Sequence, residues 1–253
     1  HNAGVAAARS EFIALQDYDD LAVPQRIERQ LALLAADPGL SLVSALAERI
    51  DAQDRADGSV FCLPEPSQHF PYSQFAAPVI TPVALGRKAI FERWRYRAEF
   101  PFAADLDFQA RLAEAGRMAV IPEVLLRYRW YDAQTTQAKA AAIERSRVAI
   151  QLTTARRRAQ RPEDLPGALA AVETTSAADA WRRGAAVALA EGHALVAAYQ
   201  ARRAFALDRS ARSATAACRL GWRAWRGATP GERPLVARMF FSGPVRALRL
   251  RPA

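Results

Sequence analysis

A short apolar run that ends in three carboxylates and leads into a helix constrains the fold of this chain more than any other feature. Residues 11–16, EFIALQ, predict a buried strand, and Asp17-Tyr18-Asp19-Asp20 follows at its carboxyl end. A helical pattern begins at Pro24 and stops at the Asp-Pro-Gly sequence of residues 37–39. Residues 40–47 predict the next strand. This order predicts an α/β fold, in which ligands bind beyond the carboxyl ends of strands.

The remaining pattern divides the chain into two parts. Residues 51–81 are rich in proline and predict loop with short strands, for which the hypotheses are a role on the acceptor side of a site or as a lid. Regular elements then return as predicted helices at 88–94 and 105–115 and predicted strands at 118–121 and 124–130. After Gln137 the chain is rich in Ala and Arg and predicts helices as far as Trp225. We therefore expect an α/β domain of residues 1–140 and an α-helical, basic C-terminal extension of residues 141–253.

Charge separates the same two parts. Residues 1–140 contain 15 Lys and Arg against 18 Asp and Glu, a net charge of −3, whereas residues 141–253 contain 20 against 8, a net charge of +12. The basic part suits an anionic membrane surface or nucleic acid. Charged residues interrupt every apolar run before the roughly 20 residues of a membrane span, so we expect membrane contact to be peripheral. Cys62 and Cys218 have no spacing that predicts a disulfide framework or zinc site, and we expect a cytoplasmic protein.

The acidic motif itself predicts a divalent cation. Three carboxylates within four residues repel one another unless a cation lies among them. Mg²⁺ and Mn²⁺ bind one or two protein carboxylates and fill their other positions with phosphate oxygens and water. The motif therefore favours a diphosphate-bearing substrate. The alternative is that Asp20 merely stabilises the N-terminus of the following helix.

Residues 2–20, NAGVAAARSEFIALQDYDD, resemble the pattern Asn-x-Gly, short helix, Gly-Glu-Tyr-Ile and Asp-x-Asp-Asp of family 2 glycosyltransferases, with Ser10 in place of the usual Gly. The resemblance implies a partial GT-A fold, a Rossmann-like mixed sheet with flanking helices. It implies that Asp17 and Asp19 contact the nucleotide sugar and that Asp19 and Asp20 hold Mn or Mg. It also implies that the base-binding strands, about a third of the catalytic domain, precede His1, so we expect this chain alone to be a poor catalyst.

A second carboxylate carries the resemblance further. Residues 102–112, FAADLDFQARL, resemble the family's Glu-Asp motif at the start of a helix, although Ala104 replaces the Glu. On a helix Asp105 shares a face with Phe108 and Leu112, whereas Asp107 points elsewhere. The resemblance implies that Asp105 is the general base that accepts the proton of an attacking hydroxyl. The alternative is that Asp105 only caps the helix.

Residues 116–129, GRMAVIPEVLLRYR, resemble the family segment that ends in Tyr-Arg and precedes a metal-binding His. Arg129 would then face the diphosphate, with an exposed strand arginine as the alternative. Tyr131 stands near the position of that His, so no His ligand is expected there.

These motifs predict a metal-assisted glycosyltransferase that moves a sugar from a nucleotide diphosphate to a hydroxyl acceptor with inversion. The resemblance implies a nucleotide-sugar donor and a glycan or lipid-linked acceptor; we expect no nucleic acid. Peripheral contact of the basic region with the inner face of the membrane is a further hypothesis, carried by residues 236–250. The alternative is that the aromatic residues of this segment pack against the domain. Two other classes stay open. An Asp-x-Asp phosphatase wants Thr or Val where Leu21 stands. It also wants a lysine partner, which is not evident here, since Lys88 is the only lysine before Lys139. A non-enzymatic basic module would bind membrane or nucleic acid through residues 141–253.

Overall fold

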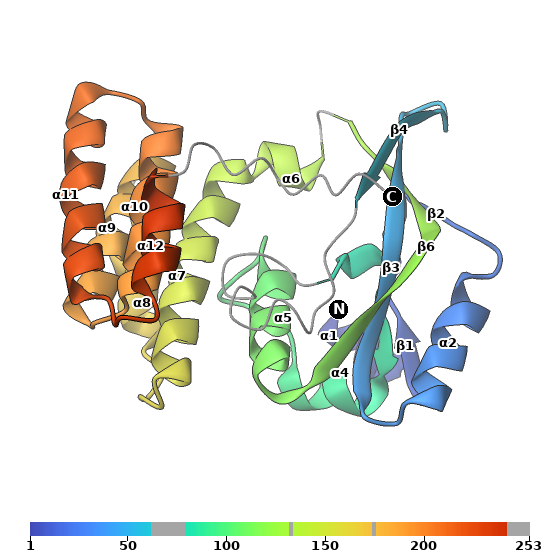
Figure 1. Ribbon diagram of the computed structural model, residues 1–253. Helices are drawn as coiled ribbons and strands as arrows, with labels where there is room; N and C mark the ends of the chain where they lie inside the picture. The colour runs from blue at the N-terminus through green and yellow to red at the C-terminus, as the bar shows by residue number, and fades with distance from the viewer. Residues whose placement is uncertain (62–78, 132–133, 174–175, 242–253) are drawn as a thin grey trace. The chain divides into compact units, whose positions relative to one another are not determined.

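The computed structural model describes residues 1–61, 79–131, 134–173 and 176–241, and it does not describe the side chains of residues 211–213 and 238–241. Two compact units, His1–Ala138 and Lys139–Ala253, make up the chain (Figure 1). The first is an α/β unit and the second is helical among its described residues. Residues 62–78, within the proline-rich segment, lie outside the described residues.

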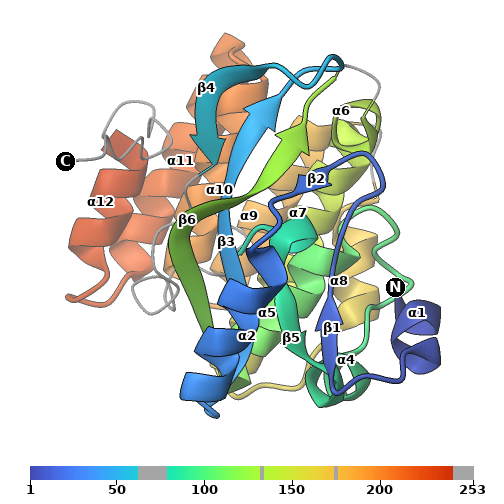
Figure 2. The ribbon, with the colours of Figure 1, turned by 90° about the vertical axis from the view of Figure 1, so that its right-hand side faces the viewer.

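The first unit is built on a curled, mixed sheet. Its strands lie in the order β1 (Phe12–Ala14), β5 (Leu85–Arg87), β3 (Leu40–Ile50), β6 (Arg117–Arg129) and β2 (Leu21–Ala22), and β4 (Ala56–Phe61) pairs with β3 (Figure 2). The long strands β3 and β6 are parallel, with Val43 opposite Ala119 and Ile50 opposite Arg129. The other described pairings are antiparallel. The α/β class with a mixed sheet is therefore confirmed.

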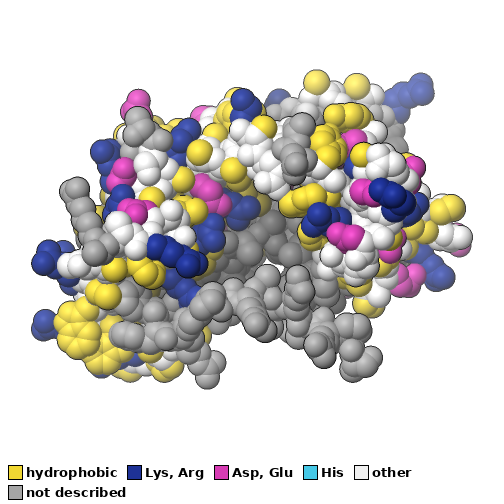
Figure 3. Space-filling model, turned by 90° about the horizontal axis from the view of Figure 1, so that it is seen from above, with side chains coloured by type: hydrophobic (Ala, Val, Ile, Leu, Met, Phe, Trp, Pro, Cys, Tyr) yellow, Lys and Arg dark blue, Asp and Glu magenta, His cyan; other side chains and the backbone are white. Residues whose placement is uncertain are grey.

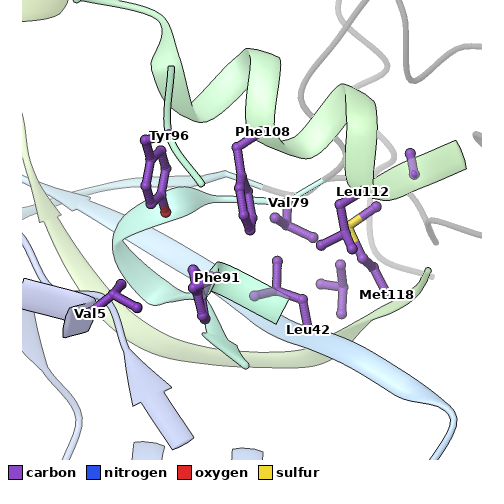
Figure 4. Close-up of a cluster of buried hydrophobic side chains, with 11 residues drawn as sticks. Val5, Leu42, Val79, Phe91, Tyr96, Phe108, Leu112 and Met118 are labelled. Atoms are coloured by element: carbon purple, nitrogen blue, oxygen red, sulfur yellow. The ribbon is translucent and has the colours of Figure 1, made fainter. Parts of the chain in front are cut away.

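Helices cover both faces of this sheet. On one face, α2 (Arg26–Ala36) packs its buried Leu34 with Val43, Leu85 and Leu126. On the other face, α4 (Lys88–Trp94) and α5 (Ala104–Ala115) supply Phe91, Phe108 and Leu112, which pack on Leu42 (Figure 4). Burial of side chains of this size stabilises the fold by about 1.5–3 kcal/mol each. The short helix α1 (Asn2–Ala7) adds Val5 to the apolar cluster formed by α4, α5 and Leu42.

Three sequence predictions need correction in this unit. The strand predicted at residues 11–16 is only three residues long and is not buried, because β1 forms the edge of the described sheet and Ala14 is exposed. The helix predicted from Pro24 begins at Arg26. The strands predicted at 118–121 and 124–130 are one strand, in which Ile121 and Val124 face consecutive residues of β3. Pro122 and Glu123 therefore form a bulge, where a missing N–H is tolerated.

The second unit consists of α7 (Ala140–Arg158), α8 (Leu165–Ala171), α9 (Ala177–Ala190), α10 (Ala194–Leu207), α11 (Ala211–Gly227) and α12 (Arg233–Phe241). The helices predicted beyond Gln137 are thus confirmed. α10 packs against α9, α11 and α12, and α7 packs against α8 and α9. The contact surfaces are formed largely by buried alanines around Trp181, which lets the helices approach closely. No helix in the described part of either unit combines the length and the apolar character needed to cross a bilayer.

Gly184 marks the closest of these approaches and gives a first testable prediction. A Cβ at this position of α9 would lie 2.2 Å from Val148 Cγ1 and 2.7 Å from Gln200 Oε1, and Val148 and Gln200 are fully buried. We expect Gly184→Ala to lower the free energy of unfolding by about 1–3 kcal/mol, because overpacking outweighs the better helix propensity of alanine. Urea denaturation measures the change. Gly227→Ala at the end of α11, where nothing lies within 4 Å, is the matched control and should not destabilise the protein.

Candidate functional site

The acidic motif lies in a loop that connects β1 at one edge of the sheet to β2 beside β6. Side-chain hydrogen bonds from Arg26 and Gln16 hold this loop in place. Arg26 of α2 donates from Nη1 to Gln16 Oε1 (2.6 Å) and from Nε to Gln30 Oε1 (3.2 Å). Gln16 Nε2 in turn donates to the backbone oxygen of Asp20 (2.9 Å). A buried arginine, only 2% exposed, thus ties the loop to the helix that follows it.

Asp20 is the buried carboxylate of the motif, at 7% exposure. Pairing of β2 with β6 brings its Oδ1 within 2.9 Å of the backbone N–H of Arg129, which donates to it. Its Oδ2 is buried and has no hydrogen-bond partner. Burial raises the pKa of Asp20 to about 6, and the charges of Asp17 and Asp19 add to this shift, while the Arg129 N–H opposes it. A carboxylate oxygen that is buried without a partner is costly and suits a bound cation.

Asp19 is held by the segment that leaves β6. The hydroxyl of Tyr131 donates to Asp19 Oδ2 (2.9 Å), and Arg129 Nε donates to the Asp19 backbone oxygen (2.7 Å). Hydrogen bonding to Tyr18 and to Asp19 raises the pKa of Tyr131, so its hydroxyl keeps its proton. Tyr131 therefore acts as a donor that orients Asp19, in the place where the family resemblance implies a His ligand.

Arg129 is the main tie between the motif and the turn after β3. Its Nη1 donates to the backbone oxygen of Asp51 (2.8 Å), and its Nη2 lies 2.6 Å from Asp54 Oδ1. With the Nε contact to Asp19, all three guanidinium nitrogens contact the protein itself. The structure thus places Arg129 at the motif, half-buried, where it supports the loop; contact with a diphosphate stays a prediction.

Asp17 connects the motif to the second carboxylate, Asp105. Its side chain is exposed at the surface of the loop. Desolvation by the surrounding protein raises the pKa of Asp17, and the negative charges of Asp19 and Asp105 raise it further. The carboxylates of Asp19 and Asp105 are thus both close enough to Asp17 to disfavour its ionised form. Leu15, two residues before Asp17, and Asp105 line one small pocket, so the acidic motif and the start of α5 lie near one another in the fold.

Asp105 lies in the first turn of α5, half-buried, where the helix dipole favours a negative charge. Its Oδ2 accepts a hydrogen bond from the hydroxyl of Thr81 (2.9 Å), and Thr81 Oγ1 accepts one from Gln109 Nε2 (2.8 Å). The N-cap position belongs to Ala103 and has no side-chain capping bond. Asp105 therefore does not cap its helix; Thr81 and Gln109 fix its orientation instead.

A small pocket opens beside Asp105. It is lined by one charged, four apolar or aromatic and two amide or hydroxyl side chains together with an alanine: Leu15, Leu42, Thr81, Ala84, Tyr96, Asp105, Phe108 and Gln109. Tyr96 is 8% exposed, and its buried hydroxyl has no hydrogen-bond partner. Burial and the charge of Asp105 raise the pKa of Tyr96, which keeps a neutral O–H donor in the pocket. Its ring stacks on Phe108 with centroids 4.8 Å apart (Figure 4).

Asp107 has a different role, as its place on the other side of the helix predicts. It is fully buried and paired with Arg111, whose Nη2 lies 2.7 Å from Asp107 Oδ2. Arg111 also donates to the backbone oxygens of Trp94 and Arg95. This pair joins α5 to the end of α4 and so fixes the helix on which Asp105 stands.

Four residues of the site carry no motif in the sequence: Thr81, Gln109, Tyr96 and Arg26. Gln109 lies four residues after Asp105, so helical periodicity indicates that it shares a face with this residue. Thr81 and Tyr96 reach the site only through tertiary packing, and no local pattern marks them.

A complete cation site is not formed by the protein alone. Among the described residues, no group of three or more His, Cys, Asp or Glu side chains is placed to hold a metal ion. A cation bound at the motif would therefore need further ligands from substrate or water. No protein-family model matches this chain, and no curated protein matches its sequence.

Proposed function

We propose that the first unit is the catalytic part of a GT-A-type glycosyltransferase of family 2, which transfers a sugar from a nucleotide diphosphate to a hydroxyl acceptor with inversion. The observation that carries the proposal is the small pocket that Leu15, two residues before the acidic motif, shares with Asp105 of α5. Such a transfer needs two kinds of group: carboxylates that bind the donor's cation and a separate carboxylate that accepts the acceptor's proton. In this unit the two groups lie on different segments, the loop between β1 and β2 and the first turn of α5.

The residues of the motif fit a hard divalent cation. Asp20 Oδ2 is buried without a partner, and the pKa of Asp20 is raised by burial and by the charges of Asp17 and Asp19. Carboxylate oxygens are the preferred ligands of Mg²⁺ and Mn²⁺, which commonly bind through one or two carboxylates plus substrate phosphates. Asp19 and Asp20 would hold the ion, with Asp17 on the nucleotide sugar. When bound, the ion stabilises the negative charge that develops on the departing diphosphate.

The other residues have roles that follow from their contacts. The oxygen of the acceptor hydroxyl attacks the anomeric carbon, and Asp105 accepts the proton of this hydroxyl. The bond from the anomeric carbon to the diphosphate breaks at the same time. Thr81, bonded to Asp105 Oδ2, orients the carboxylate so that the other oxygen faces the acceptor. Tyr131 and Arg129 hold Asp19 in place. A single displacement without a covalent intermediate inverts the anomeric configuration.

The position of Lys88 argues against a phosphatase. Its Nζ donates to the backbone oxygen of Ala8 (2.8 Å) and pairs with Glu92 (3.4 Å), at the start of α4. The aspartyl-phosphatase alternative requires a lysine that pairs with the acidic motif, and the contacts of Lys88 are with other residues. This observation favours glycosyl transfer among the enzymatic alternatives.

Donor binding that depends on a divalent cation tests the proposal. In the full-length protein, we expect sugar nucleotides from a panel to bind with Mn²⁺ or Mg²⁺ and to be released by a chelator, as measured by calorimetry. Asp19→Asn should weaken binding of the donor at least about tenfold, since a ligand to the ion is lost. Asp37→Asn, which removes a carboxylate paired with Arg117 at the end of α2, is the matched control and should leave affinity unchanged. Equal donor affinity with and without the chelator would contradict the proposal.

A further inference from the structure

The helix α11 of the second unit carries an exposed face of arginine and tryptophan. Arg219, Trp222, Arg223 and Arg226 stand at positions i, i+3, i+4 and i+7, and all four are exposed. Trp222 is 54% exposed, which is unusual for a side chain of this size. The opposite face, with Ala217 and Ala224, is buried in the unit.

Another tryptophan and another arginine lie next to this face. Trp225 stacks on Trp222 with ring centroids 5.3 Å apart, and the guanidinium of Arg233 from α12 lies 5.2 Å from the centre of the Trp225 ring. Residues 211–227 contain no Asp or Glu, within a part of the chain whose net charge is +12. In Figure 3 a group of hydrophobic side chains with Lys and Arg beside it appears on the helical unit. Indole rings with arginines and without acids form a surface complementary to anionic lipid headgroups.

We propose that the exposed face of α11, formed by Arg219, Trp222, Arg223 and Arg226 with Trp225 beside it, docks the second unit on an anionic membrane surface. Arginine side chains reach the headgroup phosphates, and the edge of the exposed indole enters the boundary between headgroups and acyl chains. The proposed docking is peripheral: it uses only the surface of α11. This inference does not depend on the reaction proposed for the first unit.

The ring contacts favour a membrane over single-stranded nucleic acid. Base stacking needs a free aromatic face; Trp225 stacks on Trp222 and holds a guanidinium over its ring, which leaves Trp222 alone of this pair to take a base, whereas recognition of single strands commonly uses several rings. Insertion at a headgroup boundary uses ring edges and is compatible with a stacked pair. The segment of residues 236–250 considered from the sequence lies mostly outside the described residues, and the proposed surface does not use it.

Co-sedimentation of the full chain with vesicles tests this surface. We expect binding to phosphatidylcholine vesicles with 30% (about one lipid in three) phosphatidylglycerol, weak binding to pure phosphatidylcholine, and loss of binding in high salt. The variant Arg219→Gln/Arg223→Gln/Arg226→Gln should weaken partitioning roughly 100-fold, since each arginine contributes roughly fivefold near such a surface. Trp222→Ala should weaken it and abolish the fluorescence blue shift that this indole contributes.

A charge-matched variant separates this face from net charge. Arg9→Gln/Arg29→Gln/Arg93→Gln removes three exposed arginines of the first unit and should keep most of the binding. Circular dichroism checks that each variant keeps its helix content. Equal loss in both triple variants, unchanged binding in the α11 variant, or no binding to anionic vesicles overturns the proposal. Binding of a single-stranded oligonucleotide that depends on the same arginines, without vesicle binding, also overturns it in favour of nucleic acid.

Discussion

Asp105→Asn is expected to lower the turnover of the full-length protein by about 10²- to 10⁴-fold, the usual contribution of a general base. Asparagine has the shape of aspartate, and its carbonyl oxygen still accepts the Thr81 hydroxyl that contacts Asp105 Oδ2 (2.9 Å). It cannot accept the proton of an acceptor hydroxyl at neutral pH. The loss should therefore appear in kcat, measured as transfer from a sugar nucleotide with Mn²⁺, while the affinity for the donor changes little.

Two further variants distinguish a base from a structural residue. Thr81→Val removes the hydroxyl that orients Asp105 and keeps the carboxylate, so we expect an intermediate loss of kcat. Glu114→Gln, near the other end of α5, removes a carboxylate from the same helix and should leave kcat unchanged. Retention of more than about a tenth of the turnover by Asp105→Asn would exclude Asp105 as the base of the reaction, by comparison with the factors typical of such groups.

Local patterns predicted the elements that carry the site. The helices expected at 88–94 and 105–115 match α4 (Lys88–Trp94) and α5 (Ala104–Ala115) closely, since apolar periodicity and helix-favouring residues agree there. The acidic residues of the motif do follow a strand. That strand is shorter and more exposed than predicted, because an apolar run does not reveal whether one neighbour or two will pair with it.

Contacts between distant segments could not be predicted in this way. Tyr131 donates to Asp19 across 112 positions of the sequence, and Arg129 contacts the motif as well as Asp51 and Asp54. Arg129 is expected near the motif only because of the family resemblance. No sequence pattern indicates that its guanidinium binds protein groups. Such partners depend on the register of β2 against β6, which is set by packing of the whole sheet.

The second large expected effect concerns Asp20, whose ionised carboxylate is proposed to bind a metal ion but lowers the stability of the metal-free protein. Its pKa is raised to about 6, chiefly by burial, against about 4 for an unfolded chain. Between these values the folded protein holds a proton that the unfolded chain has released. The free energy of unfolding therefore falls as pH rises from about 4 to about 6, by up to about 3 kcal/mol for a shift of this size. At neutral pH the ionised Asp20 destabilises the metal-free protein.

We therefore expect Asp20→Asn to stabilise the metal-free protein at pH 7 by about 1–3 kcal/mol and to flatten its stability between pH 4 and pH 6, as urea denaturation would show. Asp51→Asn is the control of opposite sign. Backbone N–H groups of Arg55 and Gln53 lower the pKa of Asp51, so its contribution is present above the unfolded value and is lost as pH falls. A stability of Asp20→Asn at or below that of the wild type at pH 7 would contradict the assignment.

The response to Mn²⁺ should reverse this order of stabilities. A ligand that binds only the folded state stabilises it by about 2.7 kcal/mol at 100 times its dissociation constant, so saturating Mn²⁺ is expected to raise the unfolding free energy of the wild type by at least this amount. Asp20→Asn lacks the buried oxygen without a partner, Oδ2, and should bind Mn²⁺ at least about 100-fold more weakly in calorimetry, the upper range for altered metal ligation. Stabilisation of both proteins to the same degree would remove Asp20 from the metal site. Such a variant would be more stable than the wild type without the ion and less stable than the wild type with it. The physical explanation is that the buried charge of Asp20 destabilises the metal-free fold and that the cation neutralises this charge.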